Sequence, residues 1–150
     1  MLTNEEIYRV ALFGHRDFNA HRQLEERLVP LLEDLMRRKS LLEIHIGRDG
    51  EFDVFAASVV KRVQSRLGSN NCDLILVLPY GKKDIQYYED YYDCVCTPIY
   101  AYPKLAISKR NEWMVERADL ILCYIERESG GAYKAVKYAI KLGKEVVNLA

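Results

Sequence analysis

Short apolar runs alternate with longer amphipathic stretches along the chain. The apolar runs predict strands over residues 7–13, 41–46, 74–78, 120–125 and 145–149. Between them, apolar residues recur every three or four positions, which predicts helices over 24–35, 52–67, 105–117 and 131–142. Strands that alternate with helices are typical of βαβ units, in which right-handed crossovers build a parallel sheet.

This order of elements predicts an α/β fold: a Rossmann-like, doubly wound, mostly parallel five-stranded sheet with helices on both faces. The chain has 150 residues, which suits one domain spanning residues 1–150. Pro30 falls inside a helical pattern and predicts a kink or a break there. Asp49 is placed to cap the second helix, and Gly143 is placed to end the last one.

The charges of the chain balance, with 22 Lys and Arg against 22 Asp and Glu. Proteins dedicated to duplex DNA usually carry a basic excess, so DNA is not an expected partner. No apolar run approaches the roughly 20 residues of a membrane helix, so no membrane partner is expected. The amino-terminal residues are acidic where a signal peptide would be basic, and the four cysteines form no Cys-x-x-Cys pair. Both features favour a cytoplasmic protein with free thiols. The three histidines show no ligand spacing, and no metal site is predicted.

Polar, charged and glycine residues follow the predicted strands directly. Open parallel sheets bind ligands outside the carboxyl ends of their strands, so these residues are the candidate site. The candidates that follow strands are Gly14, His15, Arg16, Gly47, Arg48, Glu51, Asp53, Tyr80, Ser129, Gly130 and Gly131. Arg110 and Asn111, on the helix before the fourth strand, are added as polar groups that can face the same cleft.

The turn Ser129-Gly130-Gly131 precedes a helix whose first turns carry Lys134 and Lys137 and no acid. Glycine lets the backbone approach a ligand closely, and a helix N-terminus attracts anions. The turn therefore predicts a phosphate site. The alternative is an ordinary tight turn with both lysines in water.

The segment from Gly47 to Asp53 is dense in groups suited to a nucleotide. Arg48 suits a phosphate, and Glu51 or Asp53 suits ribose hydroxyls. The alternative is a capped helix start, which explains the acids at 49 and 51 but not Arg48. His15 is a candidate acid or base, because the reference pKa of histidine lies near neutrality.

Tyrosine is concentrated in one part of the chain: six of the 11 tyrosines lie between Tyr87 and Tyr102. Tyrosine is enriched at interfaces because its ring is apolar and its hydroxyl is polar. Residues 86–92 are therefore expected to form a lid over the site or a dimer contact rather than plain core, and a homodimer is expected.

Together these motifs resemble the SLOG superfamily, which includes the DprA/SMF, LOG and YpsA-like proteins. The matching segments are Gly14-His15-Arg16, Gly47 to Asp53, Leu78-Pro79-Tyr80, Arg110 to Met114 with Asp119, and Ser129 to Ala132. The resemblance implies a doubly wound nucleotide-binding domain. Some relatives sense nucleotide-derived ligands, others hydrolyse them, and DprA relatives bind single-stranded DNA.

The chain departs from the LOG phosphoribohydrolases at their Pro-Gly-Gly-x-Gly-Thr-x-x-Glu motif. Aligned on Gly130-Gly131, the third glycine falls on Tyr133, the threonine on Lys134 and the catalytic glutamate on Lys137. A carboxylate has become an ammonium, so this position does not support LOG chemistry, while the two glycines keep their place.

The first expectation is thus a sensor or binding module for a nucleotide or nucleotide-derived small ligand, with no other cofactor indicated. The alternative is a nucleoside-phosphate N-glycosidase or phosphoribohydrolase, with Glu51 and His15 as catalytic residues. A further alternative is a protein-interaction module that uses the tyrosine-rich segment.

Overall fold

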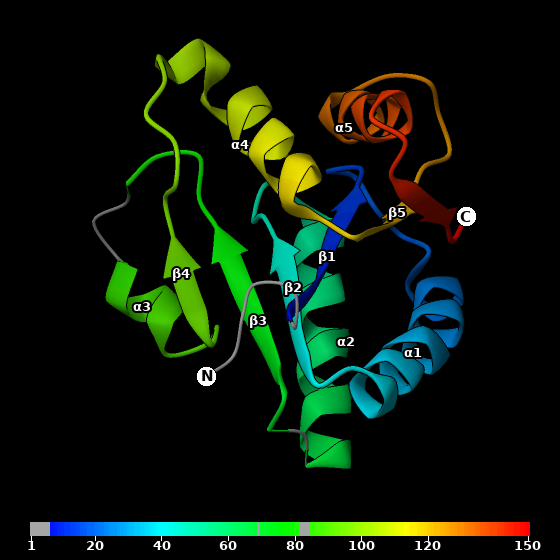
Figure 1. Ribbon diagram of the computed structural model, residues 1–150. Helices are drawn as coiled ribbons and strands as arrows, with labels where there is room; N and C mark the ends of the chain where they lie inside the picture. Colours follow the sequence, from blue (N-terminus) through cyan, green and yellow to red (C-terminus); the bar gives the residue numbers. More distant parts are fainter. Residues whose placement is uncertain (1–6, 69, 82–84) are drawn as a thin grey trace.

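Six strands form one parallel sheet. The computed structural model describes residues 7–68, 70–81 and 85–150. Its strands are β1 (Ile7–Gly14), β2 (Leu41–Ile46), β3 (Cys72–Val77), β4 (Cys94–Cys96), β5 (Leu120–Tyr124) and β6 (Glu145–Asn148). They lie in the order β4-β3-β2-β1-β5-β6, and each neighbouring pair is parallel (Figure 1).

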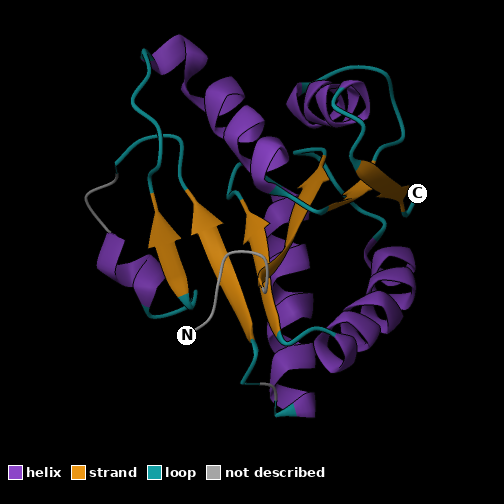
Figure 2. Cartoon of the chain, viewed as in Figure 1, coloured by secondary structure: helices purple, strands orange, loops and turns teal. Residues whose placement is uncertain are grey.

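Helices cover both faces of this sheet. They are α1 (His21–Arg38), α2 (Glu51–Leu67), α3 (Ile85–Glu89), α4 (Pro103–Arg117) and α5 (Gly131–Lys141). One apolar core joins α1 and α2 to the sheet, and a second joins α4 and α5 to the opposite face (Figure 2). The doubly wound α/β fold predicted from the sequence is confirmed.

The sheet has one strand more than the five predicted, and it is wholly parallel. The additional strand, β4, has only three residues, Cys-Val-Cys, between polar and tyrosine-rich neighbours. A segment this short shows no apolar periodicity, so the sequence pattern could not reveal it. It pairs with β3 through Ile75 and Val77 and forms one edge of the sheet.

The structure confirms one of three predictions about helix ends and breaks and differs from the other two. Gly143 has φ +75° just after α5, as predicted for the residue that ends the helix. Pro30 does not divide α1, which runs unbroken because its apolar face, including Leu28 and Leu32, is fully buried. Asp49 does not cap α2: the N-cap is Gly50, because the Asp49 carboxylate is engaged by an arginine of α4.

The order of strands reverses at β1, which lies between β2 and β5. The chain leaves β1 for α1 on one face and leaves β5 for α5 on the other. A crevice opens where two such connections diverge, at the carboxyl ends of the strands. None of the helices among the described residues combines the length and the apolarity needed to cross a membrane.

Candidate functional site

A cavity of about 320 Å³ lies in this crevice, and we call it the central cavity. It brings together nine of the residues that the sequence analysis selected: Gly14, His15, Arg16, Gly47, Asp53, Arg110, Asn111, Gly130 and Gly131. Residues from four separate segments of the chain therefore meet at one place, as their positions after the strands predict.

The N-terminus of α5 forms one wall of the central cavity. Gly130 is the N-cap, with φ +92° and no side-chain cap, and the first turn holds no acid. A β-carbon built on Gly131 would have only the Asn111 amide near it, at 3.9 Å. The free N–H groups and the positive end of the helix dipole therefore face open space, which favours an anion.

Two neutral side chains also present donors beside Gly130 and Gly131. The Nε2 atom of His15 accepts a hydrogen bond from the backbone N of Glu126 at 3.3 Å, so the ring proton belongs on Nδ1, which faces Gly130. Burial, and then the charge of Arg127, lower the pKa of His15. Asn111 accepts from Arg110 Nε through its oxygen at 2.9 Å, which leaves its amide nitrogen toward Gly131.

Arg16 is an exposed cation of the site. It lines the central cavity and two adjoining cavities, of about 720 and 170 Å³. Its backbone is held, because its carbonyl accepts from Glu51 N at 2.8 Å and Gly50 packs against its Cα. Its side chain remains at the surface, where an arginine fork can meet phosphate oxygens.

Arg110 has a different environment from the one its sequence position suggested. Its side chain is 1% exposed, below the floor of the cavity. It donates to the backbone oxygen of Val77 at 2.8 Å and forms an ion pair with Asp49. These bonds join β3, α4 and the segment after β2, so Arg110 supports the site from beneath.

The carboxylates that line the central cavity are all compensated. Asp17 pairs with Arg127 at 2.6 Å, and Asp49 pairs with Arg110. Asp53 is buried and accepts from Asp49 N at 2.9 Å, and burial raises its pKa to about 7. The three acids therefore oppose an incoming anion weakly.

Four predicted site residues lie outside the central cavity. Arg48 donates to the Tyr92 hydroxyl at 3.0 Å and lines the 720 Å³ cavity beside Glu51. Glu51 accepts from the backbone N of Phe18 at 3.2 Å. Tyr80 is exposed on the 170 Å³ cavity, and Ser129 is exposed before Gly130.

The tyrosine-rich segment 86–92 divides between surface and core. Tyr92 is buried and Tyr88 packs against the core, with Arg48 over its ring. Tyr87 and Tyr91 are exposed. The segment therefore holds Arg48 in place with one set of rings and presents the other to solvent.

A groove of about 310 Å³ between α4 and α5 continues the central cavity, and the sequence analysis missed it. We call it the α4–α5 groove. It shares Ile107, Asn111 and Gly131 with the cavity and adds two lysines, Lys104 and Lys134, and one acid, Glu112. The signal in the sequence was the lack of acids in α5, which carries three lysines, while α4 carries four basic residues and two acids.

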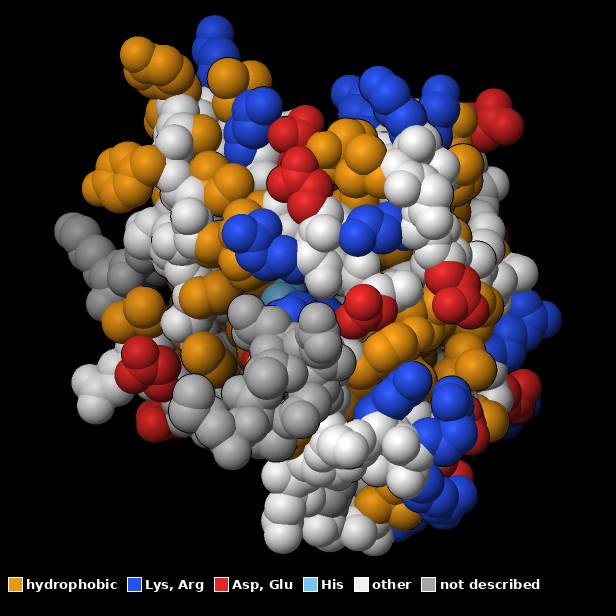
Figure 3. Space-filling model, viewed as in Figure 1, with side chains coloured by type: hydrophobic (Ala, Val, Ile, Leu, Met, Phe, Trp, Pro, Cys, Tyr) orange, Lys and Arg blue, Asp and Glu red, His pale blue; other side chains and the backbone are white. Residues whose placement is uncertain are grey.

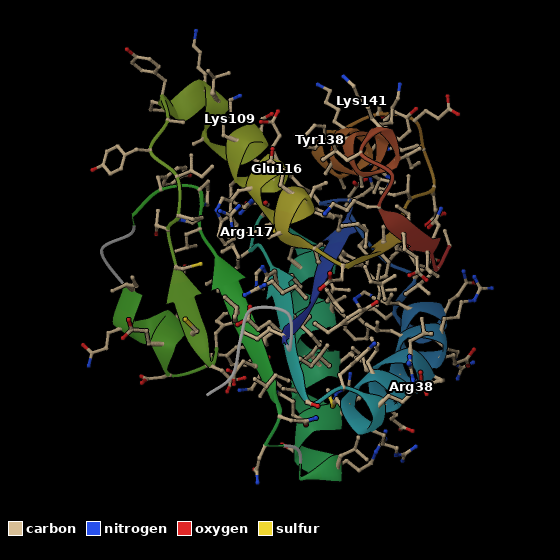
Figure 4. The ribbon with its side chains drawn as sticks, in the orientation of Figure 1. Arg38, Lys109, Glu116, Arg117, Tyr138 and Lys141 are labelled. Atoms are coloured by element: carbon tan, nitrogen blue, oxygen red, sulfur yellow. The ribbon has the colours of Figure 1, made fainter. Side chains whose placement is uncertain are left out.

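Apart from the buried Arg110, these basic residues lie at the surface of α4 and α5. Figure 3 shows Lys and Arg side chains along the edge that α4 and α5 form. The acids of α4 are engaged. Glu112 pairs with Lys109 at 3.3 Å. Glu116 accepts a hydrogen bond from the Tyr138 hydroxyl at 2.7 Å, and Figure 4 labels these two residues on α4 and α5. The charge of the chain is balanced overall but cationic here.

No family model and no curated protein matches the sequence. Solved structures do match. The chain shares its fold with DprA. It matches DNA processing protein A from Streptococcus pneumoniae with a TM-score of 0.65 at 16% identity, over 95% of this chain and 50% of that one. It matches DNA processing protein A from Helicobacter pylori with a TM-score of 0.63 at 14% identity, over 93% of this chain and 63% of that one.

The likeness confirms the Rossmann-like fold that the sequence resemblance implied. The chain spans half the length of the first of these DprA proteins and less than two thirds of the second.

The functional expectation is corrected by these matches. Both of these structures are DNA processing proteins, and the protein from Helicobacter pylori was described for its single-stranded DNA binding mode. The small-nucleotide sensor, with its glycosidase and interaction alternatives, was the wrong expectation, as was the expectation that DNA is an unlikely partner. The physical reason is that the net charge is a sum over the whole chain. A sum of zero conceals the local excess of basic residues on α4 and α5.

Proposed function

We propose that the chain binds single-stranded DNA through its backbone phosphates, in the central cavity and the α4–α5 groove. The observation that carries the proposal is the uncapped N-terminus of α5, where Gly130 and Gly131 open onto the cavity without an acid nearby in the helix. His15 Nδ1 and the Asn111 amide add neutral donors at the same point, and Arg16 adds an exposed cation. One phosphate fits this set of donors.

A polymer of phosphates suits the site because the cavity does not end at Gly131. The α4–α5 groove continues from it past Lys134 to Lys104. Proteins that bind single strands without sequence preference use a positively charged groove that follows the backbone. The fold likeness to DprA from Helicobacter pylori, a single-stranded DNA-binding protein, supports the same conclusion.

The proposal assigns binding and no chemical step. Glu51, the carboxylate first considered for catalysis, lies outside the central cavity and is bonded to Phe18 N. The lowered pKa of His15 and its bond from Glu126 keep the ring neutral at physiological pH. Both residues therefore serve the structure of the site or the orientation of the ligand.

The test is fluorescence anisotropy with a labelled oligothymidylate at several salt concentrations. Each phosphate contact contributes about 0.7 to the slope of log K against log salt for single strands. Arg16→Ala and Lys134→Ala should each weaken binding about fivefold at low salt and reduce this slope by about 0.7. Lys141→Ala is the matched control, because Lys141 is on α5 but lines neither cavity nor groove.

Two outcomes would count against the proposal. One is the absence of oligonucleotide binding to the folded wild-type protein at low salt. The other is an equal loss in Lys141→Ala and Lys134→Ala, which would indicate diffuse attraction to a basic surface without a defined path.

We also infer that the protein works in the cytoplasm, since its four cysteines are free thiols. A disulfide found in protein isolated from cells under thiol-blocking conditions would oppose this. The homodimer expected from the tyrosine-rich segment stays a prediction.

A further inference from the structure

Tyr100 and Tyr102 are the most exposed large apolar side chains among the described residues. Their relative exposures are 105% and 82%. Aromatic rings provide much of the apolar area that proteins bury in cores and interfaces. Two such rings held in solvent, two positions apart, therefore indicate a surface that receives a partner. Apolar side chains project from the molecule where α4 begins (Figure 3).

Tyr100 and Tyr102 precede α4 in the chain, close to Lys104, which lines the α4–α5 groove. Tyr102 directly precedes α4, and its carbonyl accepts from Leu105 N at 2.8 Å, which holds it at the helix start. Lys104, two positions later, lines the groove, and Gly131 lines its other part. Lys104 and Gly131 therefore belong to one groove, and the two tyrosines are next to Lys104 in the chain.

We propose that nucleobases of the bound strand stack on Tyr100 and Tyr102 while its phosphates follow Lys104 and Lys134 toward Gly131. This inference rests on the proposed function. It adds a physical basis by which the protein distinguishes single-stranded DNA from double-stranded DNA. The complementarity is chemical: lysines beside exposed rings match a polymer that alternates phosphates with flat apolar faces. Bases of a duplex are already stacked on their neighbours, so only a single strand can offer them.

The remaining tyrosines sharpen this assignment. Tyr92 is 2% exposed and holds Arg48, and Tyr88 packs against the core. Tyr87 is exposed but belongs to α3, and no residue of α3 lines the central cavity or the groove. It therefore serves as a control for exposure without access to the path.

The experiment compares an oligothymidylate with an abasic oligonucleotide of the same length. Both carry the same phosphates, and only the first can stack. Because stacking on an aromatic side chain strengthens binding by about fivefold or more per base, the wild-type protein should prefer the oligothymidylate by at least that factor. The double variant Tyr100→Ala, Tyr102→Ala should lose the preference and keep the wild-type affinity for the abasic strand.

Two further variants separate stacking from structure. Tyr100→Phe with Tyr102→Phe retains both rings and should retain the preference. Tyr87→Ala should leave it unchanged. The melting temperature of each variant reports whether it folds as the wild type does.

The results distinguish this inference from the function on which it rests. Equal wild-type affinity for both oligonucleotides would overturn stacking and leave phosphate binding in place. Equal losses for both oligonucleotides in the alanine variant would also overturn it, because that pattern reports a structural defect. Failure of the wild type to bind either one would overturn the proposed function, and the stacking with it.

Discussion

The guanidinium of Arg110 lies directly against Gly47: a β-carbon on Gly47 would stand 2.9 Å from its Nη1 atom. The same side chain reaches the carbonyl of Val77 and the carboxylate of Asp49. One buried cation thus joins α4 to the ends of β2 and β3 below the central cavity. Glycine at position 47 leaves the space that the Arg110 guanidinium occupies.

Replacing Arg110 with Met should lower the free energy of unfolding by about 3–5 kcal/mol, because it leaves the Asp49 carboxylate without its partner. Urea denaturation followed by circular dichroism measures the change. Lys104→Met is the control on the same helix, since Lys104 is exposed, and it should shift stability by at most about 0.5 kcal/mol. A loss below about 1 kcal/mol for Arg110→Met would contradict the supporting role.

Gly47→Ala should destabilise the chain by about 1–3 kcal/mol, because the added methyl group displaces the Arg110 guanidinium. The damage should be smaller in the Arg110→Met background, where a flexible apolar side chain replaces the rigid fork. A double-mutant cycle measures this coupling. Strict additivity of the two free-energy changes would show that the two residues do not interact as described.

Gly130→Ala should reduce oligonucleotide affinity, and Gly143→Ala should not. Both glycines have positive φ, +92° and +75°, so alanine is strained at either position and both variants should lose about 1 kcal/mol of stability. Only Gly130 lies at the N-terminus of α5, where a shifted backbone re-aims the free N–H groups. Anisotropy and thermal melts on both variants separate binding from folding, and equal affinities would argue against a phosphate at this turn.

Asp53 makes the stability of the chain depend on pH. Its pKa is about 7 in the folded chain against an ordinary value of 3.8, so between these values the folded chain holds a proton that the unfolded chain has lost. Stability therefore falls as pH rises through this window, by at most about 4 kcal/mol, and the full loss is present above pH 7.

Asp53→Asn removes this dependence and should keep the bond from Asp49 N, because the amide oxygen still accepts. The variant should melt above the wild type at pH 8 and close to it at pH 4. Melting temperatures at pH 4, 6 and 8 provide the test. A difference between the two proteins that stays constant with pH would refute the assignment.

The fold could be predicted from the sequence because its signals are local. The apolar runs of β1, β2 and β5, and the faces of the helices, are long enough to show their period. β4 is too short to show one, and it forms only because β3 offers a partner for its three residues. Pro30 predicted a kink or a break in α1, because the burial that keeps this helix continuous is a property of the packed molecule.

The glycines of the site could be predicted from the sequence, but the pairing of its charged residues could not. Gly14, Gly47, Gly130 and Gly131 follow strands, so topology alone brings them together. Arg110 and Asp49 lie 61 positions apart, and their pairing depends on how α4 crosses the sheet. A sequence shows that both are charged and cannot show that each neutralises the other beneath the cavity.

Both borders of the sheet consist of its shortest strands, with three residues in β4 and four in β6. The unpaired backbone groups of an edge strand can pair with a strand of another molecule, and this tendency grows with the length of the edge strand. Strands this brief offer a second molecule only a few hydrogen bonds before they end. The architecture thereby discourages β-pairing between molecules, so a concentrated solution of the protein is not expected to form fibrous assemblies.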